Sequence, residues 1–260
     1  MRIALGLEYD GAKFCGWQSQ ANGCGVQDAL EKSLLQIATY PVRVHAAGRT
    51  DTGVHARIQV IHFDTETERP MTAWVRGVNA TLPAALRVLW AVEVSNEFHA
   101  RFSAERRHYQ YLLQVSPVAP AIMASKVGWY HRALDLDAMQ AAAGLLLGEH
   151  DFSAFRAAEC QAKSPIKHLQ QAGISQHGEL FCFSFSANAF LHHMIRNIVG
   201  SLIYVGNGEQ APGWMAGLLA QQDRTHAAPT FSPDGLYLTG VHYDAKWGLP
   251  DCQRRLTILE

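Results

Sequence analysis

The sequence predicts an α+β protein made of two halves, and three observations carry that prediction. Short segments in which apolar and polar residues alternate, the period of a half-buried strand, recur along the chain. Segments with apolar residues at helical spacing lie between them. The order strand, helix, strand, strand occurs twice, which divides the chain into residues 1–103 and 104–260. We expect the halves to share one sheet that helices cover on one side.

The first half opens with a strand, because Ile3–Glu8 alternates apolar residues with small or polar ones. An amphipathic helix follows at Val26–Ile37, where apolar residues recur every three or four positions. The other elements expected here are strands at Val42–Ala46, Ile58–Phe63 and Leu86–Val94 and a short helix at Thr72–Asn79.

The second half begins with strong alternation in the strand Tyr109–Val115. The phenylalanines of Leu180–Phe185 alternate with Cys182 and Ser184, which predicts one buried face, and His177-Gly178 predicts the turn from the preceding strand. The other elements expected here are a strand at Ile166–Ile174, helices at Asp137–Leu147 (ending at Gly148), Phe190–Val205 and Gly213–Ala220, and a closing strand at Leu236–Tyr243.

Composition excludes several classes of protein. With 48% hydrophobic and 17% charged residues the chain is typical of a globular protein, not a disordered one. Glu8 and Asp10 interrupt the N-terminal apolar run too early for a signal peptide, and Phe190–Val205 is too short and polar to span a bilayer. The five cysteines form no C-x-x-C pair, so we expect free thiols, no zinc site and a cytoplasmic protein. A net charge of −1 still permits a local basic groove for nucleic acid.

The polar loop from Ala47 to Ala56 is the first candidate site. It places an acid, a base, two hydroxyls and two glycines between two apolar strands. Glycines allow sharp turns and close approach of a substrate, so Asp51 could act as a nucleophile or a general base. The alternative is a turn in which Asp51 bonds its own backbone.

Two further segments combine cations with apolar or aromatic residues. Between Arg101 and Tyr111, arginines that could neutralise phosphates stand beside tyrosines that could stack on bases, although a solvated strand edge explains the same pattern. Arg196 lies in an apolar helix, where a buried cation is costly unless a carboxylate pairs with it. His192 and His193 would point about 100° apart on a helix, so we assign no metal to them.

The loop from Gly48 to His55, and a series of further motifs in order along nearly the whole chain, resemble the TruA family of tRNA pseudouridine synthases. The loop Gly48-Arg49-Thr50-Asp51-Thr52-Gly53-Val54-His55 matches the family's Gly-Arg-Thr-Asp-Ala-Gly-Val-His with Thr52 in place of Ala. The other matching segments are Glu8–Gly11, Phe14, Gly16–Gln18, Val26-Gln27, Gly77–Asn79, Leu82-Pro83, Phe98–Ala104, Tyr109–Tyr111, Asp151-Phe152, Phe155-Arg156, Phe190, His193–Asn197 and Gly235–Leu238. Lys167 departs from the arginine expected there, which keeps a charge and loses a bidentate phosphate contact.

The resemblance implies two ferredoxin-like halves that form a central antiparallel sheet flanked by helices, with the active site in the cleft between them. It also implies an enzyme, a tRNA pseudouridine(38-40) synthase. Such an isomerase converts uridine to pseudouridine at positions 38, 39 and 40 of the anticodon stem-loop without a cofactor or a metal. The expected partners are the tRNA and a second copy of the chain in a homodimer, with no membrane.

The resemblance further implies roles for residues of this chain. Asp51 would be the essential carboxylate, kept ionised by Arg196, and Tyr109 would stack on the flipped uracil and assist loss of the C5 proton. Leu236 would form part of an apolar wall, and Arg49 would fill the gap left by the flipped base. The cations expected to contact phosphates are Arg101, Arg106, Arg107, Lys163 and Lys167.

Two other classes of function remain alternatives from the residues alone. An RNA-binding module would keep the basic and aromatic residues but would not need Asp51. A metal-dependent hydrolase is prompted by the thirteen histidines, and inhibition by EDTA would support it.

Overall fold

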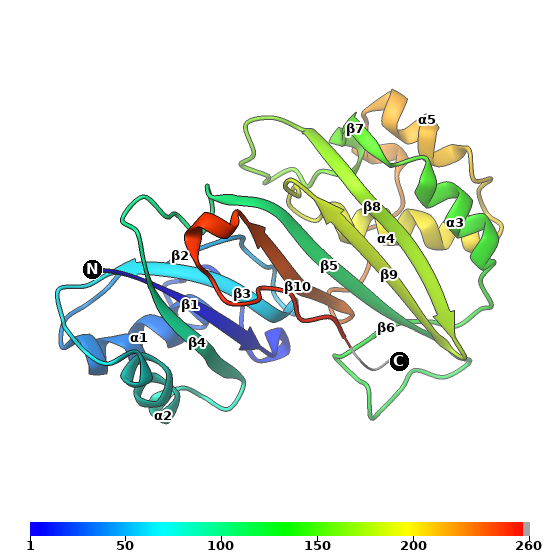
Figure 1. The fold of residues 1–260 in the computed structure, drawn as a ribbon. Coiled ribbons are helices and arrows are strands. Elements are labelled where there is room, and N and C mark those ends of the chain that lie inside the picture. The colour runs from blue at the N-terminus through cyan, green and yellow to red at the C-terminus, as the bar shows by residue number, and fades with distance from the viewer. Residues whose placement is uncertain (257–260) are drawn as a thin grey trace. The chain divides into compact units, whose positions relative to one another are not determined.

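A computed structural model describes residues 1–256 of the chain. It contains both helices and sheet strands, which confirms the predicted α+β class (Figure 1). Two compact units are present. The first comprises Met1–Arg106 and the segment that begins at Tyr237, and the second comprises Arg107–Leu236.

The first unit carries strands in the order β4, β1, β3, β10, with β2 paired to β3. Pairing is antiparallel except between β3 and β10, where Tyr237 lies opposite His55 in parallel register. The strands are β1 (Arg2–Tyr9), β2 (His45–Ala46), β3 (His55–Asp64), β4 (Leu86–Val94) and β10 (Leu236–Tyr243).

Two helices pack with each other in the first unit: α1 (Val26–Ala38), which buries its predicted apolar face, and α2 (Val78–Thr81). The segment Ala73–Gly77 before α2 is a π-helical turn that brings the fully buried Trp74 to an edge-on contact with Phe63 of β3, 5.3 Å between ring centroids. The core of this unit therefore lies between helices and sheet.

The second unit carries strands in the order β5, β9, β8, β7, with β6 paired to β5 in parallel. The other pairings are antiparallel, and Phe183 of β9 lies opposite Tyr111 of β5. The strands are β5 (Ala104–Val115), β6 (Gly128–Tyr130), β7 (Gly148–Asp151), β8 (Ile166–His177) and β9 (Leu180–Ala187).

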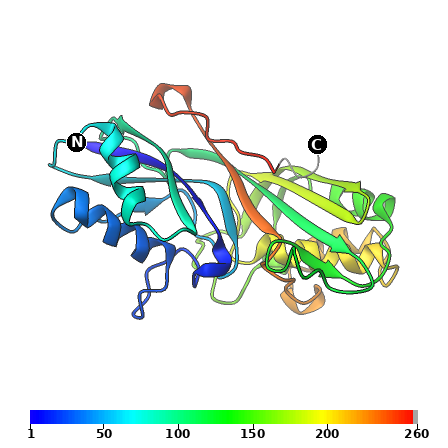
Figure 2. The same cartoon turned by 90° about the horizontal axis from the view of Figure 1, so that it is seen from below.

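Three helices belong to the second unit: α3 (Leu136–Gly144), α4 (Met194–Gly206) and α5 (Trp214–Gln221). Figure 2 shows α4 and α5 on one side of the strands of this unit. Helix α3 contacts both α4 and α5 and also β8. The mainly apolar α4 is almost wholly buried, because neighbouring elements cover it on all sides.

Helix boundaries differ from the sequence-based expectation at two places. The predicted helix Phe190–Val205 begins only at Met194, because His193 adopts a left-handed conformation (φ 61°) that no right-handed helix contains. The predicted helix ending at Gly148 stops at Gly144, and Gly148 opens strand β7 instead. Apolar content located both helices but could not fix where they end.

The expectation of five free thiols is wrong for two cysteines. Cys15 and Cys24 form a disulfide, with Cα atoms 5.4 Å apart, inside the usual range for such bonds. The loop folds back on itself, since the Cys15 amide donates to the Cys24 carbonyl oxygen at 2.9 Å. Cys160, Cys182 and Cys252 are free and buried.

Among residues 1–256, no helix has both the length and the apolar character needed to cross a membrane.

A cluster of three histidines packs at the end of the first unit where β3 finishes. The His62 ring lies 5.0 Å from His45 and 4.6 Å from His99, centroid to centroid. Its Nδ1 accepts a hydrogen bond from the Ala100 amide at 3.1 Å, which requires the neutral ring. Burial, followed by the charges of His99 and Arg2, lowers the pKa of His62 to about 3, and burial also lowers the pKa of His99.

The disulfide predicts a difference in stability between oxidised and reduced protein. It closes a short loop (sequence separation 9), so the chain-entropy relation assigns it about 2–3 kcal/mol of unfolding free energy. Urea titration of the oxidised wild type should show this excess over the Cys15→Ser/Cys24→Ser variant. A reductant should remove the excess from the wild type and leave the variant unchanged. Equal unfolding free energies for both oxidised proteins would contradict the prediction.

The histidine cluster predicts acid sensitivity. As pH falls below about 6.5 the unfolded chain protonates His62, whereas the folded protein keeps it neutral down to about pH 3, so the unfolding free energy falls across that window. One such group contributes a slope of up to about 1.4 kcal/mol per pH unit. Denaturant titrations between pH 7.5 and 5 should show a shallower slope for His62→Gln than for the wild type. The exposed His177→Gln should match the wild type, and a His62→Gln slope equal to the wild type's would refute the assignment.

Candidate active site

The loop that carries Asp51 connects β2 to β3, is bonded to β3 where it begins and closes in a turn just before β3. The Ala47 amide donates to the Val60 carbonyl oxygen at 2.8 Å, and the Gln59 side-chain amide donates to the Gly48 carbonyl oxygen at 2.7 Å. At the other end, the Val54 amide donates to the Asp51 carbonyl oxygen at 3.1 Å, across Gly53 at φ 84°. The loop is therefore a compact turn with its backbone held in place.

The segment after β1 supports the loop from the opposite side. The Trp17 amide donates to the Thr50 carbonyl oxygen at 2.9 Å, and the Tyr9 hydroxyl bonds the Thr50 hydroxyl at 2.8 Å. Gly16, at φ 88°, lies so close that a Cβ there would come within 2.9 Å of the Thr50 carbonyl oxygen. Thr50, next to Asp51, is thus held through both its backbone and its side chain.

A second glycine allows the loop to end where it does. A Cβ at Gly11 would overlap the Val54 carbonyl group, so only glycine permits this approach. The Gly11 amide also donates to Nδ1 of the buried His55 at 3.1 Å, and the His55 ring stacks on Tyr237 with centroids 4.6 Å apart. Residues 9 to 17 therefore form one side of the support for the Asp51 loop.

The Tyr9 hydroxyl that bonds Thr50 is neutral. Burial raises the pKa of Tyr9 to about 12, although its hydrogen bond with Thr50 acts in the opposite direction, so the phenol stays protonated at neutral pH. Asp51 itself is half-buried, between the buried Thr50 and the exposed Thr52, and Arg49 is exposed. Asp51 is accordingly positioned by a fixed backbone, and the residue is only half-buried.

The second unit holds Arg196 and Leu236 through one segment, residues 231–236. Arg196, in the first turn of α4, donates from Nε to the Phe231 carbonyl oxygen at 2.9 Å, and the Phe231 amide donates back to the Arg196 carbonyl oxygen at 3.3 Å. The Tyr111 hydroxyl donates to the Ser232 carbonyl oxygen at 2.9 Å. The Leu236 amide donates to the Pro233 carbonyl oxygen at 2.9 Å, and Leu236 is buried.

Tyr109 lies on β5 opposite Phe185 of β9 and is 8% exposed. Its ring meets Phe190 edge-on, with centroids 5.2 Å apart. Tyr111 is also buried, so the two tyrosines share a face, as alternation along the strand predicts. This face of β5 is aromatic and is packed within the second unit.

The candidate phosphate-binding cations differ in exposure. Arg101 and Lys163 are exposed, and Arg106 is half-buried. Arg107 is buried and donates to the Asn188 carbonyl oxygen at 2.9 Å, which ties β5 to the end of β9. Lys167 donates to the Ser164 and Ile166 carbonyl oxygens at 2.6 and 2.8 Å, and burial lowers its pKa. The last two therefore have structural contacts already.

His192 and His193 lie before α4, not within it, so helical geometry does not separate them as expected. Their ring centroids are 4.0 Å apart. The reason given for assigning them no metal is therefore wrong, and the absence of a metal stays a prediction.

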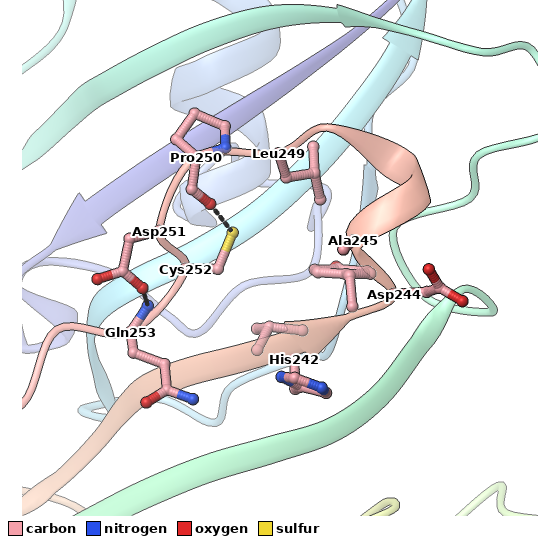
Figure 3. Close-up of a pocket in the computed structure, with 10 residues that line it drawn as sticks. His242, Asp244, Ala245, Leu249, Pro250, Asp251, Cys252 and Gln253 are labelled. Carbon is pink, nitrogen blue, oxygen red and sulfur yellow. Dashed lines mark hydrogen bonds between the residues drawn. The ribbon is translucent and has the colours of Figure 1, made fainter.

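A cavity of about 200 Å³ lies in the first unit, between β10 and the turn that follows it (Figure 3). Residues 241–245 and 249–253 line it, and in Figure 3 the Cys252 thiol points to the Pro250 carbonyl oxygen, 3.1 Å away. None of the candidate catalytic residues takes part. Ligand sites typically enclose about 300–1,000 Å³, so this cavity has the size for waters.

Sequence reasoning missed the residues that support the loop through side chains or close approach. Gln59 belongs to no recognisable motif. Tyr9, Gly11 and Gly16 lie in matching motifs, but these motifs assign them no role. The glycines were the available signal, since glycine beside a polar loop often marks close backbone approach.

Comparison with known proteins identifies the family. The sequence model of the family described as tRNA pseudouridine synthase matches residues 7–103 and 142–244, which include Asp51, Arg196 and Leu236 and leave out Tyr109. A tRNA pseudouridine synthase A of Methylobacillus flagellatus is 63% identical over 258 residues, covering 99% of each chain. Proteins of the same name from Dechloromonas aromatica and Chromobacterium violaceum are 59% and 60% identical over 251 residues, covering 96% of each chain.

These matches extend over nearly the whole chain and include the loop whose support is described above. The chain therefore belongs to the tRNA pseudouridine synthase family and is an isomerase that converts uridine in tRNA to pseudouridine.

Proposed function

We propose that this enzyme acts on uridines 38, 39 and 40 in the anticodon stem-loop, with Asp51 as the essential carboxylate. The observation that carries the role of Asp51 is its loop, whose backbone is fixed by hydrogen bonds on two sides while Asp51 itself is only half-buried. A preorganised carboxylate that a substrate can reach is what a nucleophile or base requires. The tRNA positions follow from the motifs shared with the TruA family.

The reaction moves the glycosidic bond of one nucleotide. The bond from ribose C1′ to N1 of uracil breaks, the base turns, and a bond from C1′ to C5 forms while C5 loses a proton and N1 gains one. Atoms and charge balance without a co-reactant. Because the atoms concerned are shielded in a stacked helix, the nucleotide must leave the stack at a cost of a few kcal/mol.

Asp51 starts this reaction in one of three ways: attack on C1′, attack on C6, or removal of the 2′ proton. Each needs the ionised carboxylate, and the cationic Arg196 serves as its counter-charge in the complex with tRNA. The hydrogen bond from Arg196 to Phe231 and the return bond fix the direction of the guanidinium at the start of α4.

The remaining roles concern the base and the tRNA. Tyr109 stacks on the flipped uracil and assists loss of the C5 proton, and Leu236 keeps water from the intermediate. Arg49, exposed beside Asp51, fills the space that the base leaves. Arg101 and Arg107 belong to the tRNA contact surface. The enzyme works as a homodimer in the cytoplasm.

Release of tritium from tRNA carrying [5-³H]uridine tests the role of Asp51. In EDTA, the wild type should release tritium, and Asp51→Asn should be slower by at least about a thousandfold, as when a nucleophile or its base is removed. Asp137→Asn, which changes an exposed carboxylate at the start of α3, should match the wild type. Asp51→Asn protein that is folded and keeps a tenth of the activity would refute the assignment.

A test of the target positions uses tRNA substrates in which only one of positions 38, 39 and 40 is uridine. Release from each of them, and none when all three are replaced by cytidine, is the expected result. Release from the fully replaced tRNA would place the target elsewhere. If the wild type released nothing from any tRNA but bound them all, the RNA-binding module without catalysis would be the better interpretation. Loss of release on adding EDTA would favour metal-dependent chemistry.

The support of the loop by Tyr9 predicts a loss of rate without a loss of binding. Tyr9→Phe removes the bond to Thr50, so kcat should fall roughly tenfold because the carboxylate is held less firmly, while KM for tRNA changes little. Tyr40→Phe is a matched control, since Tyr40 makes the same 2.8 Å hydroxyl bond to Thr65. It should lower stability by about 1 kcal/mol and leave kcat unchanged. Equal kcat values for the two variants would show that the Tyr9 bond has no part in positioning.

A further inference from the structure

A short turn between β4 and β5 presents an aromatic ring and a cation to solvent. Phe102 is 76% exposed, although its neighbour Phe98 is fully buried. The Arg101 guanidinium lies over the Phe102 ring, 5.6 Å from its centroid. A lone exposed apolar residue is common on protein surfaces, but a cation and an aromatic ring at one tip match what a single-stranded or splayed nucleic acid contacts.

Hydrogen bonds hold this turn in one conformation. Nδ1 of His99 accepts from the Arg101 amide at 3.1 Å and from the Phe102 amide at 3.4 Å. The Ser103 amide donates to the His99 carbonyl oxygen at 2.8 Å, and the His99 amide donates to the Ser103 hydroxyl at 3.0 Å. The exposed ring is thus presented on a fixed turn, which lowers the entropic cost of binding.

The histidine cluster anchors the turn to the core. The His99 ring lies 4.3 Å from the Phe102 ring and 4.6 Å from the His62 ring, and His62 accepts from the Ala100 amide. One row of rings therefore leads from the buried strand β3 to the exposed Phe102. The neutral state of His62 is needed for this arrangement, because its Nδ1 must accept.

The position of His62 gives the distance from this turn to the Asp51 loop. His55 begins β3 beside that loop, and His62 lies seven residues further along the strand. At ~3.3 Å per residue, His55 and His62 are roughly 23 Å apart along β3. The stem of an anticodon arm, about five base pairs, extends only about 14 Å at the ~2.8 Å rise of an A-form RNA helix.

We propose that Phe102 and Arg101 form a second tRNA-binding point outside the anticodon arm, with Phe102 stacking on a base and Arg101 contacting the adjoining phosphate. The proposed contact rests on the family's tRNA substrate. The placement of the contact beyond the anticodon arm rests on the proposed target positions, uridines 38, 39 and 40. The tRNA then runs along the first unit from the Asp51 loop to this turn.

Binding to product tRNA, converted beforehand by wild-type enzyme, tests the contact without turnover. Phe102→Ala should weaken binding about tenfold, within the range for loss of one base stack, and Phe102→Trp should not. Phe102→Leu keeps an apolar side chain without a ring face and should behave like Phe102→Ala. Ile122→Ala, which removes a 96% exposed side chain of the second unit, is the control and should match the wild type. Wild-type affinity in Phe102→Ala, or equal affinity in the Leu and Trp variants, would overturn the stacking role.

Two further measurements locate the contact. Arg101→Gln should weaken binding and reduce the slope of log K against log salt by about one, as for the loss of one phosphate contact. On full-length tRNA, Phe102→Ala should raise KM with unchanged kcat, whereas an isolated anticodon arm should be bound equally by variant and wild type. An equal loss on both RNAs would overturn the placement but leave the proposed target positions intact. A change of oligomeric state in Phe102→Ala, with unchanged RNA affinity, would make the turn a protein contact and refute the proposal.

Discussion

The fixed position of Thr50 is the constraint on which the Asp51 loop depends. Its carbonyl oxygen accepts from Trp17 and its hydroxyl bonds Tyr9, so the residue before Asp51 can neither rotate nor shift outward. Both contacts come from residues more than thirty positions away in the sequence. They use neutral groups, and this matters because a buried charge beside a carboxylate would change its affinity for protons. The backbone next to Asp51 is therefore positioned through uncharged groups.

The same support also begins helix α1. The first amides of a helix have no partner within the helix and need acceptors outside it. Here the Val26 and Gln27 amides donate to the Gly16 and Trp17 carbonyl oxygens, each at 3.0 Å, while the Trp17 amide holds Thr50. The peptide groups of one short segment thus satisfy the helix on one side and the loop on the other. Helix stability and loop geometry are therefore linked.

The sequence predicts those elements that are determined by a pattern within one segment better than those that are determined by contacts with distant segments. Periodicity located β1, α1 and β9 well, because burial of one face repeats along each of them. The three-residue strand β6 and four-residue strand β7 are too short to show a period, and partners elsewhere in the chain define them. The disulfide was missed because a separation of nine residues matches no metal or redox motif.

In the candidate site, too, local sequence predicts some features and distant partners determine the others. Residue types and family motifs pointed to Asp51, Arg196, Tyr109 and Leu236. The contacts that position the Asp51 loop could not be read from them, since Tyr9 and Thr50 are 41 positions apart and Gln59 carries no motif. Gly11 and Gly16 were the exception among these supporting residues, because a glycine indicates that another group packs close to the backbone even when that group is unknown.

Arg196 raises the question of how an apolar helix accommodates a cation. The first turn of a helix is an unfavourable place for positive charge, because the helix dipole is positive there. The Phe231 carbonyl oxygen accepts from Nε and offsets part of that cost, and the side chain is half-buried rather than buried. The segment that supplies this oxygen also leads to Leu236 and accepts from Tyr111. A displacement of that segment would therefore move the cation and the apolar wall together, so the two proposed roles depend on one piece of backbone.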